Sequence, residues 1–308
     1  MKKVLVTGAT GFLGQACIRQ LQKTELEIYA CDLNVGADSH DGVHWLAMDL
    51  FDEAAVTKVL DEVRPDILLH LAWGMGRGEG GAFSYNSDDH WRWADISCQL
   101  ARKFSHVGGS RMVVAGSNFE YDKTADICRE DSTPLIPVTV YGESKHALML
   151  RLRELCGETG MTLGWGRVFF LYGPNENPSR LIPHVIRSIL AGEEVKTTHG
   201  LQVRDYMCVD DVASGLVALL ESDIDGAANI CCGEPVSLKE MIEYIAEKLG
   251  GSDLLHIGAI PAPGHEMPVR LGDNSFLCEQ TGWKPMYTMR SGLDEMIDSI
   301  KEEVLHER

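Results

Sequence analysis

The sequence lacks several features, and each absence narrows the possible functions. Its 308 residues contain no apolar run that approaches the roughly 18 residues of a membrane-spanning helix, so we expect no membrane partner. Positive charge is scarce, because 28 Lys and Arg face 46 Asp and Glu and leave a net charge of −18. Nucleic acids and anionic membranes are polyanions, so neither is an expected partner. Any anionic ligand needs a local cluster of Arg or Lys.

The sequence also lacks a cysteine pattern typical of disulfides or of a C-x-x-C site. The nine Cys are an odd number, contain no C-x-x-C pair, and include the adjacent Cys231 and Cys232 in a predicted buried strand. This usage favours reduced thiols that pack as small apolar groups. The first residues form a predicted core strand, so no signal peptide is visible. Together these features predict a cytoplasmic protein.

Three glycines near the start form the most informative motif. The apolar strand Val4–Val6 leads into Gly8, Gly11 and Gly14, and a helix is predicted to follow. The first glycine permits a tight turn, the second lets a pyrophosphate approach the backbone, and the third lets the helix pack close to the strand. The helix start then offers free N–H groups and the positive end of its dipole to phosphates. The motif predicts a dinucleotide site.

Two acids follow at the ends of the next predicted strands. Asp32 comes after strand 27–31, about 20 residues beyond the glycines, where a carboxylate accepts hydrogen bonds from the adenosine ribose. No Arg or Lys lies in 32–35 to hold a 2′-phosphate, which favours NAD over NADP. Asp49 and Leu50, after strand 44–48, are placed to flank the adenine.

Strands and helices alternate through much of the chain. The predicted strands are 3–7, 27–31, 44–48, 66–71, 111–115, 162–169 and 228–232, with early helices at 12–22 and 54–63. This order predicts an α/β fold, a doubly wound parallel Rossmann sheet with a smaller C-terminal substrate-binding lobe. We assign residues 1–172 and 207–232 to the NAD-binding part, and 173–206 and 233–308 to the lobe. The glycine-rich segment 74–81 is either an active-site loop or a surface insertion.

A tyrosine and a lysine stand four residues apart in a predicted helix. Tyr141 and Lys145 therefore share one face, and the preceding strand delivers Ser117 to the same sheet edge. The ammonium of Lys145 is expected to lower the pKa of the phenol from about 10 toward neutrality. Tyr141 can then exchange a proton with a carbinol while a nicotinamide exchanges the hydride, and Ser117 can hydrogen-bond the same oxygen.

These motifs resemble the extended short-chain dehydrogenases/reductases that act on nucleotide sugars. The resemblance runs nearly end to end and also covers 70–72, 167–174, 204–206, 209–211, Arg270, Asp273 and 282–285. It implies that Lys145 contacts the nicotinamide ribose, and that Arg204 and Arg270 meet the nucleotide and diphosphate of the substrate. The implied sets are Ser117, Tyr141 and Lys145 for catalysis; Gly8, Gly11, Phe12, Leu13, Gly14, Asp32, Asp49, Leu50, Leu71, Ala72, Tyr141 and Lys145 for NAD; and Asn118, Arg180, Arg204 and Arg270 for substrate.

Three places depart from the pattern of that family. Asn118 and Phe119 stand where the 4,6-dehydratases carry an Asp-Glu pair, and Glu120 would point away if the segment were extended. Elimination of water then has no obvious acid and base, so dehydration is disfavoured. Phe170 replaces an Asn that contacts the diphosphate or sugar in many members. Trp73 replaces an Ala and narrows the pocket near the nicotinamide.

The resemblance implies an NAD-dependent oxidoreductase that acts on a nucleotide-linked deoxysugar. The run 116–121 favours a 4-ketoreductase, or the reverse 4-dehydrogenase, and no metal site is predicted. Two alternatives stay open: an epimerase that transiently reduces bound NAD, and a non-catalytic dinucleotide sensor. Family members dimerise through the counterparts of 87–105 and 141–156. We predict a homodimer, since the first segment holds more large apolar residues than one sheet face needs, namely Trp91, Trp93, Ile96, Leu100 and Phe104.

Overall fold

The computed structural model describes residues 1–35, 42–74, 84–262 and 267–306. Its centre is a seven-stranded parallel sheet in the order β12-β7-β5-β4-β1-β2-β3. This order reverses direction beside β1, as a doubly wound Rossmann sheet requires. The strands are β1 Lys3–Thr7, β2 Glu27–Asp32, β3 Val43–Ala47, β4 Ile67–His70, β5 Arg111–Ser117, β7 Thr162–Val168 and β12 Gly226–Ile230.

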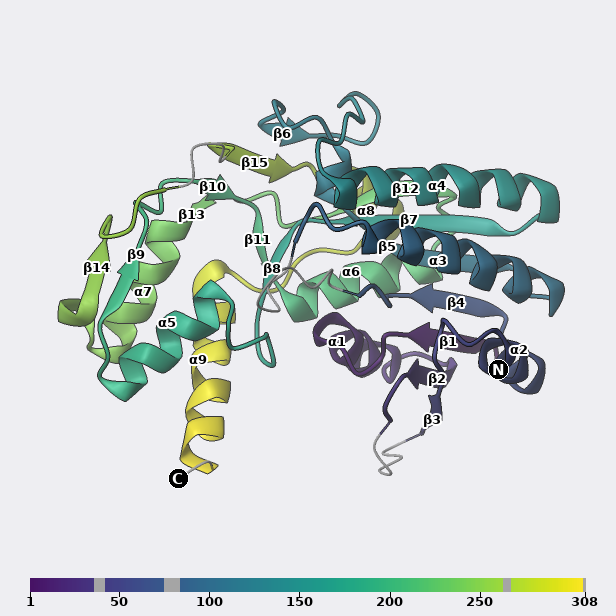
Figure 1. Ribbon diagram of the computed structural model, residues 1–308, viewed down its shortest axis with the longest axis horizontal. Helices are drawn as coiled ribbons and strands as arrows, with labels where there is room; N and C mark the ends of the chain where they lie inside the picture. The colour runs from purple at the N-terminus through teal and green to yellow at the C-terminus, as the bar shows by residue number, and fades with distance from the viewer. Residues whose placement is uncertain (36–41, 75–83, 263–266, 307–308) are drawn as a thin grey trace.

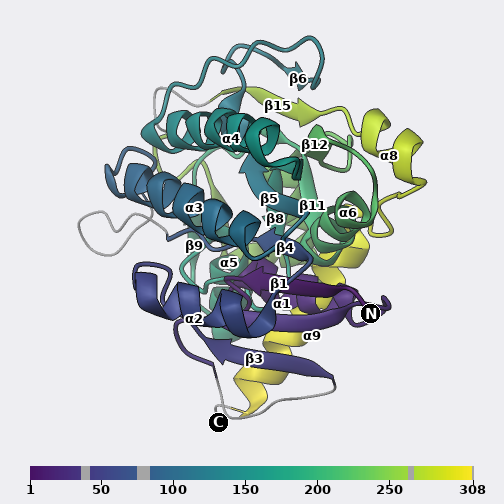
Figure 2. The ribbon, with the colours of Figure 1, turned by 90° about the vertical axis from the view of Figure 1, so that its right-hand side faces the viewer.

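Helices cover both faces of this sheet, which explains why its central strands are apolar on both sides. Figure 2 shows α2, α3 and α4 together on one face and α6 on the other. Alternate residues of β1 serve the two cores: Leu5 packs with α2, α3 and α4, whereas Val4 and Val6 pack with α1 and α6. The helices are α1 Phe12–Leu21, α2 Glu53–Val63, α3 Asp89–His106, α4 Val140–Thr159 and α6 Val209–Glu221.

The start of α4 is fixed by its own sequence. Thr139 is the N-cap, and its side chain accepts a hydrogen bond from the backbone N–H of Gly142. The helix ends at Gly160, which adopts a left-handed conformation (φ 78°) that suits glycine. This cap places Tyr141 in the first turn, at the sheet edge where the strands end.

A second lobe lies beyond the carboxyl ends of the strands, at the left of Figure 1. Its core joins α5 Leu181–Ala191, α7 Leu238–Leu249 and α9 Met289–His306. A four-stranded sheet, β13-β10-β15-β6, borders it. β6 comes from within the predicted NAD-binding part and pairs with β15. The remaining elements are β6 Ile127–Cys128, β8 Phe170–Tyr172, β9 Val195–Thr197, β10 Val203–Arg204, β11 Tyr206–Cys208, β13 Val236–Ser237, β14 Leu255–Ile257, β15 Val269–Gly272, α8 Ser275–Thr281, and the 3-10 turns η2 Asn118–Glu120 and η3 Ser252–Leu254.

The predicted Rossmann sheet is confirmed strand for strand. All nine cysteines are free thiols, as their pattern predicted. Within the described part of the chain, no helix is both long and apolar enough to cross a membrane. The glycine-rich segment 74–81 lies outside the described residues after Gly74, so neither interpretation of it is tested.

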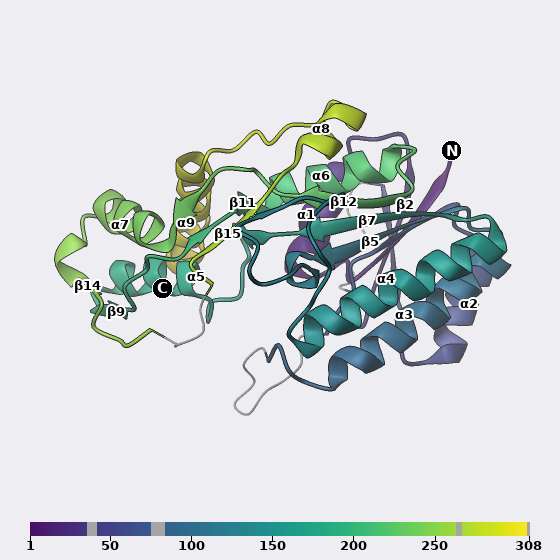
Figure 3. The ribbon, with the colours of Figure 1, turned by 90° about the horizontal axis from the view of Figure 1, so that it is seen from above.

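Four of the five large apolar residues that suggested a surplus on α3 belong to the core or pack against it, and Trp91 is half-buried. Leu100 is 2 % exposed and Phe104 is fully buried, while Trp93 and Ile96 pack against the core on that face of the sheet. These side chains are used within one chain, because α3 and α4 pack on each other as well as on the sheet (Figure 3). The homodimer therefore needs other support.

Candidate active site

The glycine turn has the geometry that a dinucleotide requires. Gly8 has φ +71°, and a Cβ built on it would lie 2.8 Å from the backbone of Ala72. A Cβ on Gly14 would lie 2.0 Å from the carbonyl oxygen of Gly8. Any side chain at these positions would push the turn, α1 and β4 apart. α1 begins at Gly11 with no side-chain cap and no acid in its first turn, so its N–H groups face the sheet edge. The cradle fits a pyrophosphate.

Asp32 lies beside this turn at the end of β2. Its Oδ2 accepts hydrogen bonds from the backbone N–H of Thr10 at 3.0 Å and from the Thr10 hydroxyl at 2.7 Å, and its Oδ1 accepts from the N–H of Leu33. These bonds hold the carboxylate at the sheet edge with acceptor capacity left for a diol. Asp49 is exposed and Leu50 buried next to it. Leu71 and Ala72 are half-buried after β4. Contacts of these groups with NAD stay predictions.

The three predicted catalytic residues meet at one point. Ser117 ends β5 and its hydroxyl is hydrogen-bonded to the Tyr141 side chain. The Lys145 ammonium donates to the carbonyl of Ala115 at 2.8 Å and lies 6.0 Å from the centre of the Tyr141 ring. Ser117 and Lys145 are each only 4 % exposed. The structure thus brings together residues that the sequence separates by 28 positions.

The expected lowering of the Tyr141 pKa is wrong for this structure. Burial raises the pKa of Tyr141, and this exceeds the lowering by the Ser117 hydrogen bond. Electrostatic interactions with Tyr85 and with the carboxylate of Glu120 raise it further. Burial also disfavours the charged form of Lys145 and lowers the pKa of Lys145 to about 7. Tyr141 is therefore a protonated phenol, which is the state of a proton donor.

Lys145 sits on an aromatic platform that the sequence motif did not indicate. Its Nζ lies 3.7 Å from the centre of the Trp73 ring. The Trp73 indole N–H donates to His90 Nδ1 at 3.1 Å, and His90 Nε2 lies 2.9 Å from the carbonyl oxygen of Ser84. These hydrogen bonds fix the orientation of Trp73, whose ring faces the predicted catalytic lysine. That Trp73 narrows the pocket near the nicotinamide stays a prediction.

His70 is a buried structural group. Its two ring nitrogens are within 2.7 Å of the Thr7 hydroxyl and 2.8 Å of the Ser97 hydroxyl. Burial, with a smaller contribution from the charge of Lys145, lowers the pKa of His70 to about 3. It is neutral at physiological pH and ties β1, β4 and α3 together below the site.

Glu120 was expected to point away from the site on an extended segment. Residues 118–120 instead form a 3-10 turn. Glu120 is fully buried. Its carboxylate accepts from Arg167 Nε at 3.0 Å and from the indole N–H of Trp165 at 2.9 Å. The expectation that it offers no free carboxyl to the substrate holds for a different reason: its oxygens are occupied. Asn118, also buried, donates to the Val168 carbonyl, and its Oδ1 has no partner among the described residues.

A row of half-buried aromatic rings leads from Tyr141 toward the second lobe. Phe119 lies 6.0 Å from Tyr141 and 6.3 Å from Phe170, and Phe170 lies 5.6 Å from Tyr206, all between ring centres. Tyr85 stacks on Phe119 at 4.6 Å. The row presents flat, largely apolar faces, and Phe170 contributes one of them at the position where many members of the resembling family carry an Asn. Sugar faces rich in C–H groups suit such a surface.

Arg204 lies at the far end of this row, and Arg270 is its neighbour in the sheet of the lobe. Arg204 on β10 is in register with Arg270 on β15, so both side chains leave the same face of a parallel pair. The Arg204 guanidinium lies 5.5 Å from the Phe170 ring centre. Arg270 is 1 % exposed and donates to the carbonyl of Asp122, while its Nε has no partner among the described residues. Arg180 is exposed at the start of α5 and pairs with Glu176. The paired guanidinium groups suit an anion on a chain this acidic.

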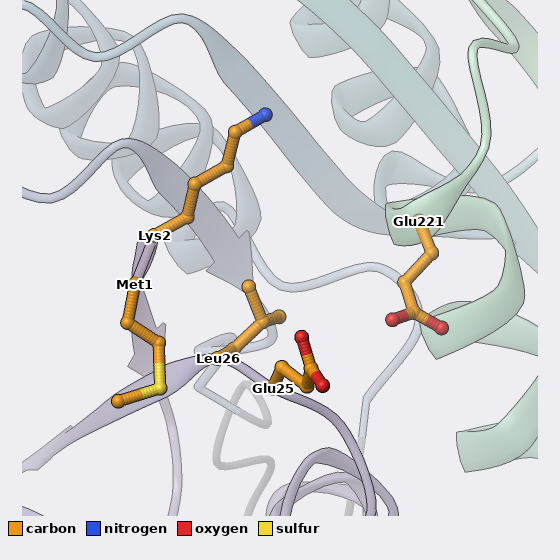
Figure 4. A pocket seen from close by; sticks show the side chains of 5 residues that line it. All are labelled: Met1, Lys2, Glu25, Leu26 and Glu221. Carbon is orange, nitrogen blue, oxygen red and sulfur yellow. The ribbon is translucent and has the colours of Figure 1, made fainter.

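A hollow also lies at the opposite edge of the sheet. Figure 4 shows the side chains that line it: Met1 and Lys2 beside the start of β1, Glu25 and Leu26 before β2, and Glu221 at the end of α6. In open α/β sheets ligands bind at the carboxyl ends of the strands. None of the predicted site residues lines this hollow, and we assign it no role.

Sequence analysis missed the groups that support the catalytic set. Glu120 lies in η2, whereas Trp165 and Arg167 both lie on β7, and only the fold brings the two segments together. A signal was present for Glu120, since a charged residue beside a buried strand end needs a partner. Nothing in the position of His90 in the sequence indicated that it would accept a hydrogen bond from Trp73.

Comparisons with known proteins agree on one family. The sequence profile described as the NAD dependent epimerase/dehydratase family matches residues 4–231. A dTDP-glucose 4,6-dehydratase of Neisseria gonorrhoeae is 26 % identical over 96 % of this chain and 94 % of its own length. Among solved structures, UDP-glucose 4-epimerase of Thermotoga maritima has a TM-score of 0.85 at 19 % identity, over 98 % of this chain and 99 % of that one. MoeE5 in complex with UDP-glucuronic acid and NAD has a TM-score of 0.81 at 25 % identity, with the same coverage.

Proposed function

Because this chain belongs to the NAD dependent epimerase/dehydratase family and is an NAD-dependent enzyme of the extended short-chain dehydrogenase/reductase type, we propose that it is a 4-ketoreductase of a nucleotide-linked deoxysugar. The reaction converts a keto sugar, NADH and a proton to the corresponding alcohol and NAD⁺. NADH, when bound, supplies the hydride. Its reverse, a 4-dehydrogenase, uses the same residues.

The observation that carries this proposal is the protonated Tyr141 beside Ser117. Because its pKa is raised, the phenol of Tyr141 keeps its proton at neutral pH, and the protonated form is the one that a donor to a carbonyl oxygen needs. Ser117 donates a hydrogen bond to the same oxygen and fixes its place. Lys145, held between Ala115 and Trp73, stabilises the negative charge that Tyr141 acquires.

Elimination of water is disfavoured by the residues beside the catalytic set. A dehydratase needs an acid and a base next to the reacting carbons. The turn after Ser117 holds Asn118, Phe119 and Glu120, and the carboxylate of Glu120 is taken by Arg167 and Trp165. The described residues after Ser117 therefore supply no free acid and base for elimination, although a relative that is 26 % identical is a dehydratase.

The substrate would span from Tyr141 to the two arginines of the lobe. Arg204 and Arg270 suit a nucleotide diphosphate, and the rings of Phe119 and Phe170 suit the C–H face of a deoxysugar between them. NAD would occupy the edge formed by the glycine turn, with Asp32 at the adenosine ribose.

The test measures NADH consumption with dTDP-4-keto-6-deoxyglucose and its UDP and CDP counterparts. A reductase oxidises one NADH for each sugar reduced. Native mass spectrometry of the purified protein identifies retained cofactor. Retained NAD with an isomerised sugar and no net NADH oxidation would instead identify an epimerase. No turnover of any sugar nucleotide, with NADH-dependent binding of a protein partner, would identify a sensor.

We also propose a cytoplasmic homodimer built on α3 and α4. The two helices lie side by side at the surface (Figure 3), and Leu150 on α4 is 54 % exposed. The nine free thiols support a reducing compartment. Sedimentation should give a dimer at micromolar concentration, and Leu150→Glu should dissociate it. A monomer in the unmutated protein would contradict the proposal.

A further inference from the structure

A buried polar network lies beneath the catalytic serine, and the proposed reaction does not use it. Its centre is Glu120, which is fully buried, and its cation is Arg167, whose side chain is 2 % exposed. Arg167 also donates to the Tyr121 hydroxyl, which donates in turn to Asn229. A charged pair is thus held in the interior directly below the site.

The carboxylate of Glu120 is fixed by three residues on two strands, β5 and β7. Its Oε1 accepts from the backbone N–H of Ser117 at 2.8 Å and from Trp165 Nε1 at 2.9 Å, and its Oε2 accepts from Arg167 Nε at 3.0 Å. Gly116 makes room for this arrangement, since a Cβ there would lie 2.8 Å from Glu120 Oε1 and 2.2 Å from Trp165 Nε1. The last residues of β5 are shaped around the carboxylate.

Burying this ion pair costs free energy, and the end of a strand can be held in place without one. Removing two charges from water costs several kcal/mol, and a well-packed apolar pair is often as stable. A role for the charge itself would account for its presence. Glu120 acts on the site by its charge: it raises the pKa of Lys145 against the lowering by burial, and it raises the pKa of Tyr141.

We propose that Glu120 is a positioning residue of the reaction, which fixes the backbone of Ser117 and supplies the negative charge that balances the Lys145 ammonium. Arg167 holds that carboxylate in its place. The inference rests on the proposed function, because it takes Ser117 and Lys145 as members of the catalytic set.

Among the residues that the structure describes, the other groups around Lys145 carry no compensating negative charge. From β4, His70 is neutral, with its pKa lowered to about 3. From the segment after β4, Trp73 offers a ring face, and from β5, Ala115 offers a carbonyl. On its own helix α4, Tyr141 is protonated. Glu120 in η2 is the group whose charge raises the pKa of Lys145.

Two substitutions separate the two parts of the role. Glu120→Gln keeps an acceptor for the Ser117 N–H and loses the charge, so the pKa of Lys145 should fall by about one unit. Glu120→Asp keeps the charge and shortens the reach to Ser117. In that variant the pKa of Lys145 should stay near 7 while kcat falls about tenfold and the KM for substrate stays unchanged. Glu143→Gln, an exposed carboxylate in the first turn of α4, is the matched control and should change neither quantity.

The primary readout is the titration of the Lys145 ammonium by NMR in isotopically labelled, cofactor-free protein. If Glu120→Gln does not fold, Glu120→Gln with Arg167→Met removes both charges and should shift the pKa of Lys145 in the same direction. An unchanged Lys145 pKa in the folded variant would overturn the inference. Because this readout needs no turnover, a shift without any reduction of 4-keto sugar nucleotides would refute the proposed function alone. Turnover with no shift would refute only the inference.

Discussion

The cofactor edge and the substrate edge of this site are built in different ways. The cofactor edge is shaped by backbone: Gly8 and Gly14 leave no room for a Cβ, and α1 starts without a side-chain cap. The substrate edge is assembled from side chains, with Arg204 and Arg270 on two strands of the lobe and Phe170 between them and the catalytic set. A site made of backbone is encoded in a few consecutive residues. A site made of side chains from distant elements depends on the whole fold.

The two edges also differ in how they attract anions. The cofactor edge relies on N–H groups and the positive end of the α1 dipole. The substrate edge relies on guanidinium groups, which are scarce on a chain with a net charge of −18. Substitutions on one edge should therefore leave binding at the other edge intact.

Tyr141 stands where the two edges meet, and its loss should have the largest effect. Tyr141→Phe removes only the hydroxyl, so NADH affinity and the apparent KM for substrate should remain while kcat falls by about 10² to 10⁴. Steady-state kinetics and NADH titration measure the two quantities. Tyr244→Phe, which removes a hydroxyl bonded to Asp294 in the lobe, is the control and should keep full activity. A Tyr141→Phe variant near the unmutated rate would place the chemistry elsewhere.

Arg204→Met should weaken binding at the substrate edge and leave binding at the cofactor edge unchanged. It removes a charge at the substrate edge, so KM for the sugar nucleotide should rise about 10- to 100-fold, the usual worth of a hydrogen bond to a charged group. NADH affinity should not change. Arg290→Met is the matched control, because Arg290 also lies over an aromatic ring, that of Tyr244, but is exposed in the lobe. Equal losses of NADH and substrate affinity would show that the edges are not independent.

Asp32→Ala should give the smallest effect, and it should change cofactor binding rather than substrate binding. The unmutated protein should prefer NADH over NADPH by about tenfold, or about 1.4 kcal/mol, and the substitution should erode that preference. KM for the sugar nucleotide should stay the same. Isothermal titration with both cofactors measures the preference. Equal affinity for both in the unmutated protein would remove Asp32 from the ribose site.

The sequence predicted the local structure of the proposed cofactor edge, whose contacts with NAD stay predictions. The glycine spacing, Asp32 at the end of β2, and the strands of the sheet all follow from local patterns. The i, i+4 spacing of Tyr141 and Lys145 placed both on one face, and the preceding strand placed Ser117 beside them. These features depend on short stretches of chain.

The rest could not be predicted, for physical reasons. The pKa of Tyr141 depends on burial, which exceeds the influence of a nearby ammonium, and burial is known only after the fold. The conformation of residues 118–120 was set by Ser117 and Glu120, whose capping interaction turned an expected extended segment into a 3-10 turn. The apolar surplus on α3 disappeared once Leu100 and Phe104 proved to be core. Each error concerns a tertiary contact.

The central claim is that this site moves a hydride from NADH to a carbonyl carbon while Tyr141 protonates the oxygen. It is tested most directly with NADH deuterated at the transferred position and dTDP-4-keto-6-deoxyglucose, or the UDP or CDP counterpart that turns over. NMR and mass spectrometry of the product should find one deuterium on C4 of the sugar and one NAD⁺ formed per alcohol. A sugar product without deuterium, formed with no net oxidation of NADH, would contradict the claim.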